Sequence, residues 1–182
     1  DPERISLGMA GSTKAGSMNA TFVPAKHGQP HCGTAALPCS VPGKMLAVYM
    51  LDMDNFKPVN DQHGHDVGDE LLMVVAARLR ATMRVGDVVA RTGGDEFVVV
   101  ASGLQNESQA ADLGDKLLDI FSSPFALAQQ ICHVGITIGY ALAPNDGNDA
   151  GSLLKRADAA MYSGKQNGEN RVGRGVTTIP PH

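Results

Sequence analysis

The sequence predicts an α+β fold: a mixed sheet of the ferredoxin-like or polymerase-palm kind, with a β-hairpin and flanking helices. Apolar runs of strand length alternate with segments in which apolar residues recur at helical spacing. Two of these runs flank a Gly-Gly-Asp turn, which is typical of a hairpin and requires antiparallel neighbours in the sheet. Strands joined partly by helices and partly by a hairpin therefore predict a mixed sheet covered by helices.

Each expected element follows from its own pattern. The run 46–51 is short, apolar and followed by two acids, which predicts a buried strand. The polar segment 56–68 contains Pro58, Gly64 and Gly68 and predicts a turn. The remaining expected elements, in chain order, are a helix over 69–83, hairpin strands over 88–92 and 97–101, a helix over 108–121, a strand over 134–142 and a helix over 152–164.

The chain divides near residue 45. Residues 1–44 are rich in Gly, Ala, Ser, Thr and Pro without helical or strand period, which predicts an irregular N-terminal extension or an altered first segment. Regular elements occupy 45–175, the expected domain, and 176–182 form a short tail.

Composition excludes several classes of function. With 182 residues and a net charge of −4, the chain has no basic field for a nucleic-acid backbone, so we expect no nucleic-acid partner. No apolar run reaches the ~18 residues that span a bilayer, so we expect no direct membrane insertion. Three cysteines at irregular spacing predict reduced thiols and a cytoplasmic location, or the cytosolic part of a larger, membrane-anchored sensor.

Two acidic spots are expected to meet. Asp52 and Asp54 end the first strand, and Asp95 and Glu96 lie at the hairpin tip. If this strand pairs with the hairpin, Asp52 and Asp95 approach each other, and two close carboxylates repel unless a cation lies between them. Such a pair suits Mg²⁺ and phosphoryl or nucleotidyl transfer. The alternative is that these acids only cap turns.

The segment between Asn55 and Asp69 suggests phosphate and base recognition. A polar turn after a strand can offer backbone N–H groups to an anion, and Lys57 would add a positive charge. Asn60 and Asp69 have the donors and acceptors that recognise a guanine edge. The alternatives are a solvated surface lysine at Lys57 and a helix N-cap at Asp69.

Four blocks, in order, resemble the GGDEF family of diguanylate cyclases. They are LDMDNFKPVNDQHGHDVGD over 51–69, RTGGDEF over 91–97, TIGY over 137–140, and RADAAMY over 156–162 with Lys165 and GENR over 168–171. The blocks cover about residues 45–173. The resemblance implies a nucleotide-cyclase-like fold and an enzyme that condenses two GTP into cyclic di-GMP and two pyrophosphates.

The resemblance also implies roles for individual residues. Asp52, the Met53 carbonyl and Asp95 would hold Mg²⁺ or Mn²⁺. Asp95, Glu96 and Lys57 would be catalytic. The implied GTP-binding residues are Asp54, Asn55, Phe56 and Lys57 through their backbone, Lys57 and Lys165 through their charge, Asn60 and Asp69 at guanine, and Gly93 and Gly94 at the α-phosphate and ribose. Each domain holds one GTP, so a homodimer is expected.

Arg84 and Asp87 form an RxxD motif, and five residues, 88–92, separate it from Gly93. This spacing resembles the family's inhibitory site for cyclic di-GMP, with Arg at phosphate and guanine and Asp at a guanine edge. The alternative is a helix C-terminal arginine followed by a turn aspartate.

Two departures weaken the resemblance. The first 44 residues lack the family's usual DxLTxLxNR motif and carry Met18 to Phe22 and a Gly/Pro/Cys-rich run instead. Glu169 stands where the family usually has Arg. The alternative function is thus a catalytically weak or degenerate module that senses GTP or cyclic di-GMP; a third is a dimerisation domain without ligand.

Glu169→Arg should lower the Michaelis constant for GTP. Exchanging a negative for a positive charge beside phosphate removes a repulsion of ~1 kcal/mol or more in a partly shielded site. Initial-rate kinetics over a series of GTP concentrations measures the change. An unchanged Michaelis constant would show that Glu169 does not lie at the phosphate site.

Overall fold

The computed structural model describes residues 21–22, 43–167 and 172–174. Its elements are β1 (Thr21–Phe22), β2 (Met45–Asp54), α1 (Phe56–His63), α2 (His65–Thr82), β3 (Val88–Gly93), β4 (Glu96–Leu104), α3 (Glu107–Asp119), β5 (Phe125–Ala126), β6 (Ile131–Cys132), β7 (Gly135–Ala143), α4 (Ala150–Gln166) and β8 (Val172–Arg174).

Six strands form the main sheet, in the order β1-β3-β4-β2-β7-β8. All neighbours pair antiparallel except β7 and β8, which are parallel. β3 and β4 are the expected hairpin, and β2 lies between β4 and β7. The mixed sheet with a hairpin and flanking helices that the sequence predicts is confirmed.

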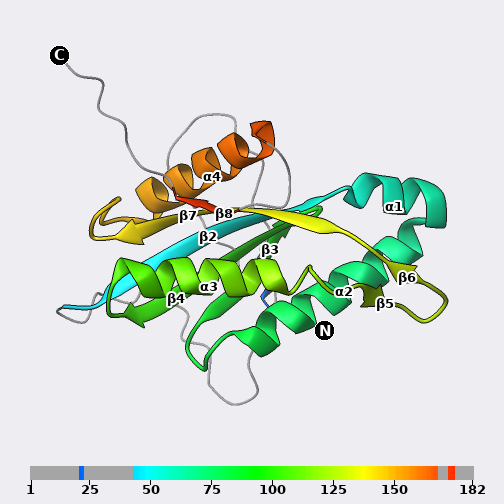
Figure 1. Cartoon of the computed structure of the whole chain (residues 1–182), viewed down its shortest axis with the longest axis horizontal. Helices are drawn as coiled ribbons and strands as arrows, with labels where there is room; N and C mark the ends of the chain where they lie inside the picture. The colour runs from blue at the N-terminus through cyan, green and yellow to red at the C-terminus, as the bar shows by residue number, and fades with distance from the viewer. Residues whose placement is uncertain (1–20, 23–42, 168–171, 175–182) are drawn as a thin grey trace.

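Helices cover both faces of this sheet. Alternate residues of β2 point to opposite faces, as the strand period of two requires. Tyr49 and Leu51 pack in the larger core with residues of α2 and α3, whereas Val48 and Met50 pack against α4. Figure 1 shows α4 on one side of the sheet and α2 and α3 on the other. Asp52 and Asp54 lie an even number of positions along β2 from Val48 and Met50, so their side chains point to the same face, which α4 covers.

Two polar side chains, Tyr49 and Arg78, fix the helices of the larger core. The buried Tyr49 hydroxyl donates to the Ala110 carbonyl of α3 at 2.7 Å. Arg78 of α2 donates to the carbonyls of Ile120, Ser123 and Pro124 and lies 4.1 Å from the centre of the Phe125 ring. α2 is thereby joined to the segment that follows α3, which lies at its side in Figure 1.

The expected turn over 56–68 is wrong. This segment forms α1, and α2 begins at His65, four residues before the predicted start. Pro58 lies in the first turn of α1, where a missing N–H breaks no helical hydrogen bond. α1 buries only Phe56 and Val59, so its apolar period is too weak to show in the sequence. Gly64, with φ 89°, separates the two helices.

Three short pieces of sheet were not predicted. β5 and β6 form a two-stranded sheet, β8 joins the edge of the main sheet, and β1 pairs with β3 from within the segment expected to be irregular. Each of these four strands has only two or three residues, too few for an alternating pattern to appear.

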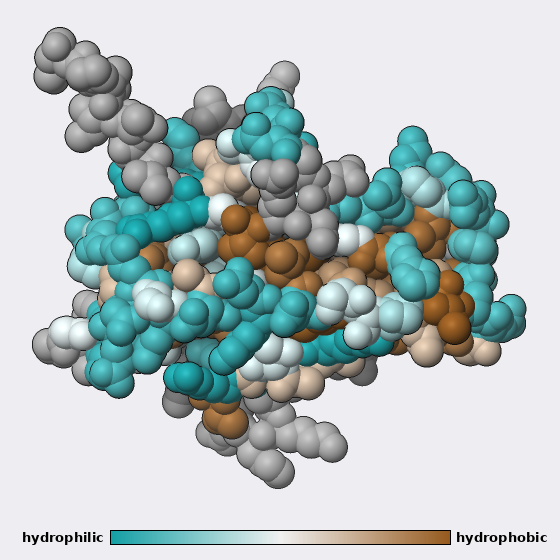
Figure 2. Space-filling model, in the orientation of Figure 1, coloured by the Kyte–Doolittle hydropathy of each residue, from teal (hydrophilic) through white to brown (hydrophobic). Residues whose placement is uncertain are grey.

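The surface is mixed, with hydrophilic residues over much of the face shown in Figure 2 and hydrophobic colour at the end where β5 and β6 lie. Ile131 of β6 is 66% exposed there. Within the described ranges, no helix is both long and apolar enough to cross a membrane.

Candidate active site

The acids at the end of β2 and at the hairpin tip do meet. β2 pairs with β4 so that Asp52 stands opposite Glu96. One residue further, the Met53 N–H donates to the Asp95 carbonyl at 3.2 Å. The expected approach of Asp52 to the hairpin acids is therefore confirmed, and Met53 is brought beside Asp95 by its backbone while its side chain is buried.

This cluster is electrostatically unfavourable without a cation. Burial and the charge of Asp52 raise the pKa of Asp95 above its ordinary value. Burial, Asp52, Asp95 and Asp158 of α4 likewise raise the pKa of Glu96. The site consequently favours a proton or a positive charge close to its carboxylates.

Lys165, in the last turn of α4, supplies such a charge. Its Nζ lies 2.5 Å from Asp52 Oδ1 and 4.0 Å from Asp54 Oδ1. Partial burial lowers the pKa of this ammonium, but the hydrogen bond to Asp52 and the neighbouring carboxylates outweigh burial and raise it overall. The sequence resemblance assigned Lys165 to GTP phosphates; the structure places it on the carboxylate expected to bind metal.

Asp54 has a buried partner that the sequence did not reveal. Its side chain is 2% exposed, and the Thr137 hydroxyl donates to Oδ1 at 2.9 Å and Oδ2 at 3.1 Å. Thr137 stands opposite Asp52 in the β2–β7 register, so its side chain lies on the same face. The TIGY block marked Thr137 as part of a strand, but nothing local indicated its contact.

Thr137→Val should destabilise the fold by about 1–3 kcal/mol, because the isosteric change removes a donor from a buried carboxylate. Thr137→Ser should retain most of the stability. Denaturant midpoints of both variants measure the difference. Equal midpoints for Val and Ser would show that the hydroxyl contributes nothing.

The segment expected to bind phosphate is the N-terminal end of α1. Asn55 precedes the helix in the left-handed conformation, with φ 62°. The Phe56 side chain is buried in the core and leaves only its backbone for a ligand, while Lys57 is exposed in the first turn. Backbone N–H groups at a helix N-terminus suit an anion. The segment is therefore a helix end rather than the expected turn, but it still offers N–H groups to a phosphate.

The two candidate guanine-binding residues come from different helices. Asn60 of α1 lies against Gly68 of α2, where a Cβ would collide with the Asn60 carboxamide. Asp69 is the next residue of α2 and is exposed. The alternative of an N-cap at Asp69 is wrong, because the N-cap of α2 is Gly64. Gly68 therefore allows α1 to approach α2 and brings Asn60 near Asp69.

The hairpin tip is open to a ligand. Gly94 has φ 43°, and Arg91 Nε donates to its carbonyl at 2.8 Å, which holds the turn. Nothing lies within 4 Å of the positions where Cβ atoms of Gly93 or Gly94 would stand. A nucleotide could thus approach this backbone closely, as the resemblance implies.

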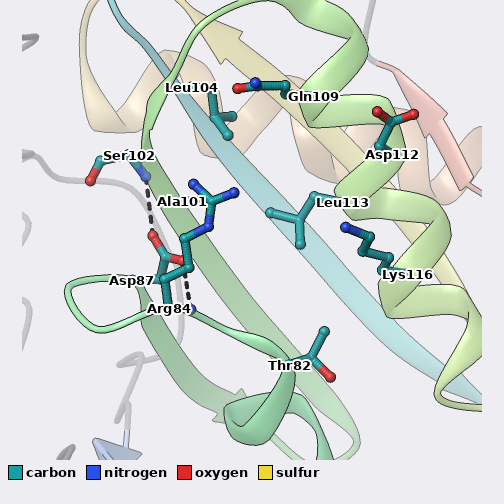
Figure 3. Close-up of a pocket in the computed structure, with 10 residues that line it drawn as sticks. All are labelled: Thr82, Arg84, Asp87, Ala101, Ser102, Leu104, Gln109, Asp112, Leu113 and Lys116. Carbon is teal, nitrogen blue, oxygen red and sulfur yellow. Dashed lines mark hydrogen bonds between the residues drawn. The ribbon is translucent and has the colours of Figure 1, made fainter.

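Arg84 and Asp87 lie at the opposite end of β3 from the hairpin tip. Asp87 accepts hydrogen bonds from Arg84 N at 3.0 Å and Ser102 N at 3.4 Å, so it stabilises the turn after α2. A pocket of about 290 Å³ opens beside this turn. In Figure 3 the Arg84 side chain points toward the space between β4 and α3, with Asp112 and Lys116 of α3 across it. Both the turn-stabilising role and space for a ligand are thus present.

A divalent cation fits the donors of the candidate site. No group of three His, Cys, Asp or Glu side chains among the described residues could hold a metal ion alone. Mg²⁺ is usually bound through one or two carboxylates together with substrate phosphates, and Asp52, Asp95 and the Met53 carbonyl are hard oxygen donors of that kind. Residues 1–20, 23–42 and 168–171, with Met18, Cys32, Cys39 and Glu169, lie outside the described residues, so the expectations placed on them stay predictions.

Sequence comparisons place this chain in a known family. The model for "Diguanylate cyclase, GGDEF domain" matches residues 33–171. MucR of Pseudomonas aeruginosa, a bifunctional diguanylate cyclase/cyclic di-GMP phosphodiesterase, is 42% identical over 127 residues, 70% of this chain and 18% of MucR. The cyclic di-GMP phosphodiesterase NbdA of the same organism is 42% identical over 134 residues, 74% of this chain and 17% of NbdA. The chain spans less than a fifth of either relative.

Comparison with solved structures indicates the same family. The GGDEF domain of PA1120 (YfiN or TpbB) from Pseudomonas aeruginosa matches with a TM-score of 0.72 and 34% identity, over 74% of this chain and 84% of that one. The GGDEF domain of DgcB from Caulobacter crescentus, in complex with c-di-GMP, matches with a TM-score of 0.63 and 28% identity, over 74% and 80%. The chain belongs to the GGDEF family of diguanylate cyclase domains and to the proteins of cyclic di-GMP signalling.

Proposed function

We propose that this domain is one half of a diguanylate cyclase, which condenses two GTP into cyclic di-GMP and two pyrophosphates. The observation that carries the proposal is the convergence of Asp52, Asp95 and Glu96, from β2 and the hairpin, beside Lys165 of α4. Acids whose pKa values are raised by one another, next to a basic side chain, mark a place built for cation-assisted phosphate chemistry.

Each part of the site has a task in this reaction. The N-terminal end of α1 and Lys57 bind the β- and γ-phosphates, and Asn60 and Asp69 bind guanine. Lys165 neutralises phosphate charge, and Asp95 and Glu96 orient the reacting groups; Glu96 accepts the proton of a 3′-hydroxyl. A bound Mg²⁺ or Mn²⁺ would stabilise charge on the phosphate oxygens and lower the pKa of the attacking hydroxyl.

The chemistry requires two copies of the domain. One domain holds one GTP, and each 3′-hydroxyl must reach the α-phosphorus of the other nucleotide. We therefore propose that activity depends on a homodimer whose candidate active sites face each other. The rate per protomer should rise with protein concentration until dimerisation is complete.

Incubation of the purified protein with GTP and Mg²⁺, followed by chromatography, tests the proposal. We expect cyclic di-GMP and pyrophosphate in a 1:2 ratio, in keeping with the reaction's balance of atoms. No cyclic di-GMP at high protein concentration, with GTP binding retained in calorimetry, would instead establish a binding module. Two observations favour that second function. Glu169 carries a negative charge where the family usually has Arg, and NbdA, which is as similar to this chain as MucR, is named a phosphodiesterase.

Arg84→Ala should weaken product inhibition. The pocket beside Arg84 and Asp87 has room for a ligand, and losing a guanidinium that binds phosphate or guanine typically costs 1.5–3 kcal/mol, so we expect the inhibition constant of cyclic di-GMP to rise by about tenfold or more. Progress curves with added cyclic di-GMP measure it, with the exposed Lys155→Ala on α4 as the charge-matched control. If Arg84→Ala has the same inhibition constant as the Lys155→Ala control, Arg84 does not contribute to the inhibitory site.

A further inference from the structure

We propose that Lys165 is an internal counter-cation of the metal site: it binds the Asp52 carboxylate, and a divalent cation must displace it to bind there. The inference rests on the proposed role of Asp52 as a metal ligand. It assigns to Lys165 a second role beyond phosphate binding, in which the side chain controls access of the cation to its carboxylate.

The contact between Lys165 and Asp52 is close and shielded. Nζ and Oδ1 are 2.5 Å apart, a short charge-assisted hydrogen bond, and the side chains are 35% and 16% exposed. The ammonium therefore lies on the carboxylate oxygen itself. A divalent cation on the same oxygen would stand within a few ångströms of the ammonium, and like charges at that separation repel strongly in a partly shielded site. The two cations should exclude each other.

Lys165 has another carboxylate within reach when it leaves Asp52. Asp54 Oδ1 lies 4.0 Å from Nζ, and the Thr137 hydroxyl holds the Asp54 carboxylate in place. A small rotation of the lysine side chain would shorten this contact while clearing Asp52. Displacement then moves the ammonium between two neighbouring acids, and no charge is left buried without a partner.

The arrangement couples cation and nucleotide. A GTP phosphate would offer Lys165 a new anionic partner and so draw it away from Asp52. Binding of the nucleotide should thereby favour binding of the cation, and the reverse must hold to the same degree.

Titration with Mn²⁺ alone, without nucleotide, tests the proposal in the whole chain. The free Mn²⁺ is followed by electron paramagnetic resonance for wild type, Lys165→Met and Lys165→Gln. We expect both variants to bind Mn²⁺ about three- to tenfold more tightly than wild type, since the competing ammonium is gone and a partly exposed ion pair is worth a few-fold in affinity. The gain should disappear in Asp52→Asn/Lys165→Met.

Lys155→Met is the matched control. It removes the same charge from the same helix, but Lys155 is exposed and lies more than two turns before Lys165. A general electrostatic effect would raise Mn²⁺ affinity equally in both variants, whereas competition predicts a change of less than about twofold for Lys155→Met because exposed charges are largely screened at this range.

The proposal is overturned if Lys165→Met and Lys165→Gln bind Mn²⁺ no more tightly than wild type, if Lys155→Met gains as much, or if the gain survives in the double variant. A GTP turnover assay on wild type separates this outcome from failure of the proposed function. If wild type is inactive but the Lys165 variants bind Mn²⁺ more tightly, the proposed cyclase activity is refuted and the competition between Lys165 and the cation stands. If wild type is active and the variants gain no Mn²⁺ affinity, the cyclase activity stands and the competition is refuted.

Discussion

Asp95→Asn should abolish cyclic di-GMP synthesis and at the same time stabilise the domain in the absence of divalent cations. Turnover should fall by about a hundredfold or more, because the carboxylate that we propose to hold the cation and orient the reacting groups is lost. The midpoint of thermal unfolding should rise by roughly 2–4 °C, equivalent to ~1 kcal/mol for a domain of this size after allowance for solvent screening. Activity falls because the carboxylate is lost, and stability rises because the substitution relieves the burial of a charge and its repulsion by Asp52.

The stabilisation should depend on pH in a definite direction. Burial and Asp52 raise the pKa of folded Asp95 above its ordinary value of 3.8. The folded state therefore retains a proton that the unfolded state has released, and wild type loses stability as the pH rises through the folded pKa. The advantage of Asn should be absent below pH 3.8, where Asp95 is neutral in both states, and complete at neutral pH.

Thermal unfolding over a pH series, with and without Mn²⁺, measures these effects. Asp61→Asn is the control, because Asp61 is an exposed acid on α1 away from the cluster. Mn²⁺ should stabilise wild type more than Asp95→Asn, so the difference between their unfolding midpoints should become smaller when Mn²⁺ is present. If Asp95→Asn unfolds at the same temperature as wild type at pH 7 without Mn²⁺, Asp95 is under no net repulsion.

Gly139→Ala should have the largest effect on the fold. A Cβ at Gly139 would stand closer than 3.0 Å to the Ala157 carbonyl and to the backbone of Met161, so β7 and α4 would have to separate. Neither neighbour is a flexible side chain. We expect a loss of roughly 3 kcal/mol or more, at the upper end of overpacking, and a fall in the unfolding midpoint of about 10 °C.

Gly173→Ala provides a matched control. Gly173 of β8 is the register partner of Gly139, but a Cβ there would meet only the Ala160 carbonyl at 3.8 Å, an ordinary contact. Gly173→Ala should therefore unfold within about 1 kcal/mol of wild type, as substitutions without a steric conflict usually do. Similar losses in both variants would mean that β7 and α4 tolerate a methyl group between them.

The same substitution should disturb the candidate active site from a distance. Lys165 reaches Asp52 because α4 lies directly on β7, and an outward shift of the helix would carry its last turn away from the carboxylates. Where Gly139→Ala remains folded, its Mn²⁺ affinity should move toward that of Lys165→Met. An affinity equal to wild type would show that the position of Lys165 does not depend on this close approach.

The patterns that predicted the fold correctly were those with enough apolar residues to show a period. β2, the hairpin, α3, β7 and α4 all appear within a few residues of their predicted bounds. α1 was missed because it buries two residues and contains Pro58, and β8 because three residues show no alternation. In the site, the meeting of Asp52 with Asp95 and Glu96 followed from one assumption, that the first strand pairs with the hairpin.

The sequence by itself determined the α+β class, the acids at the hairpin and at the end of the first strand, and membership of the GGDEF family. Only the tertiary structure decided which groups these acids touch. Thr137 is 83 positions from Asp54, and Lys165 is 113 positions from Asp52. Contacts over such distances depend on strand register and on how closely α4 approaches β7, which are set by packing on both faces of the sheet and leave no mark in the local pattern of residues.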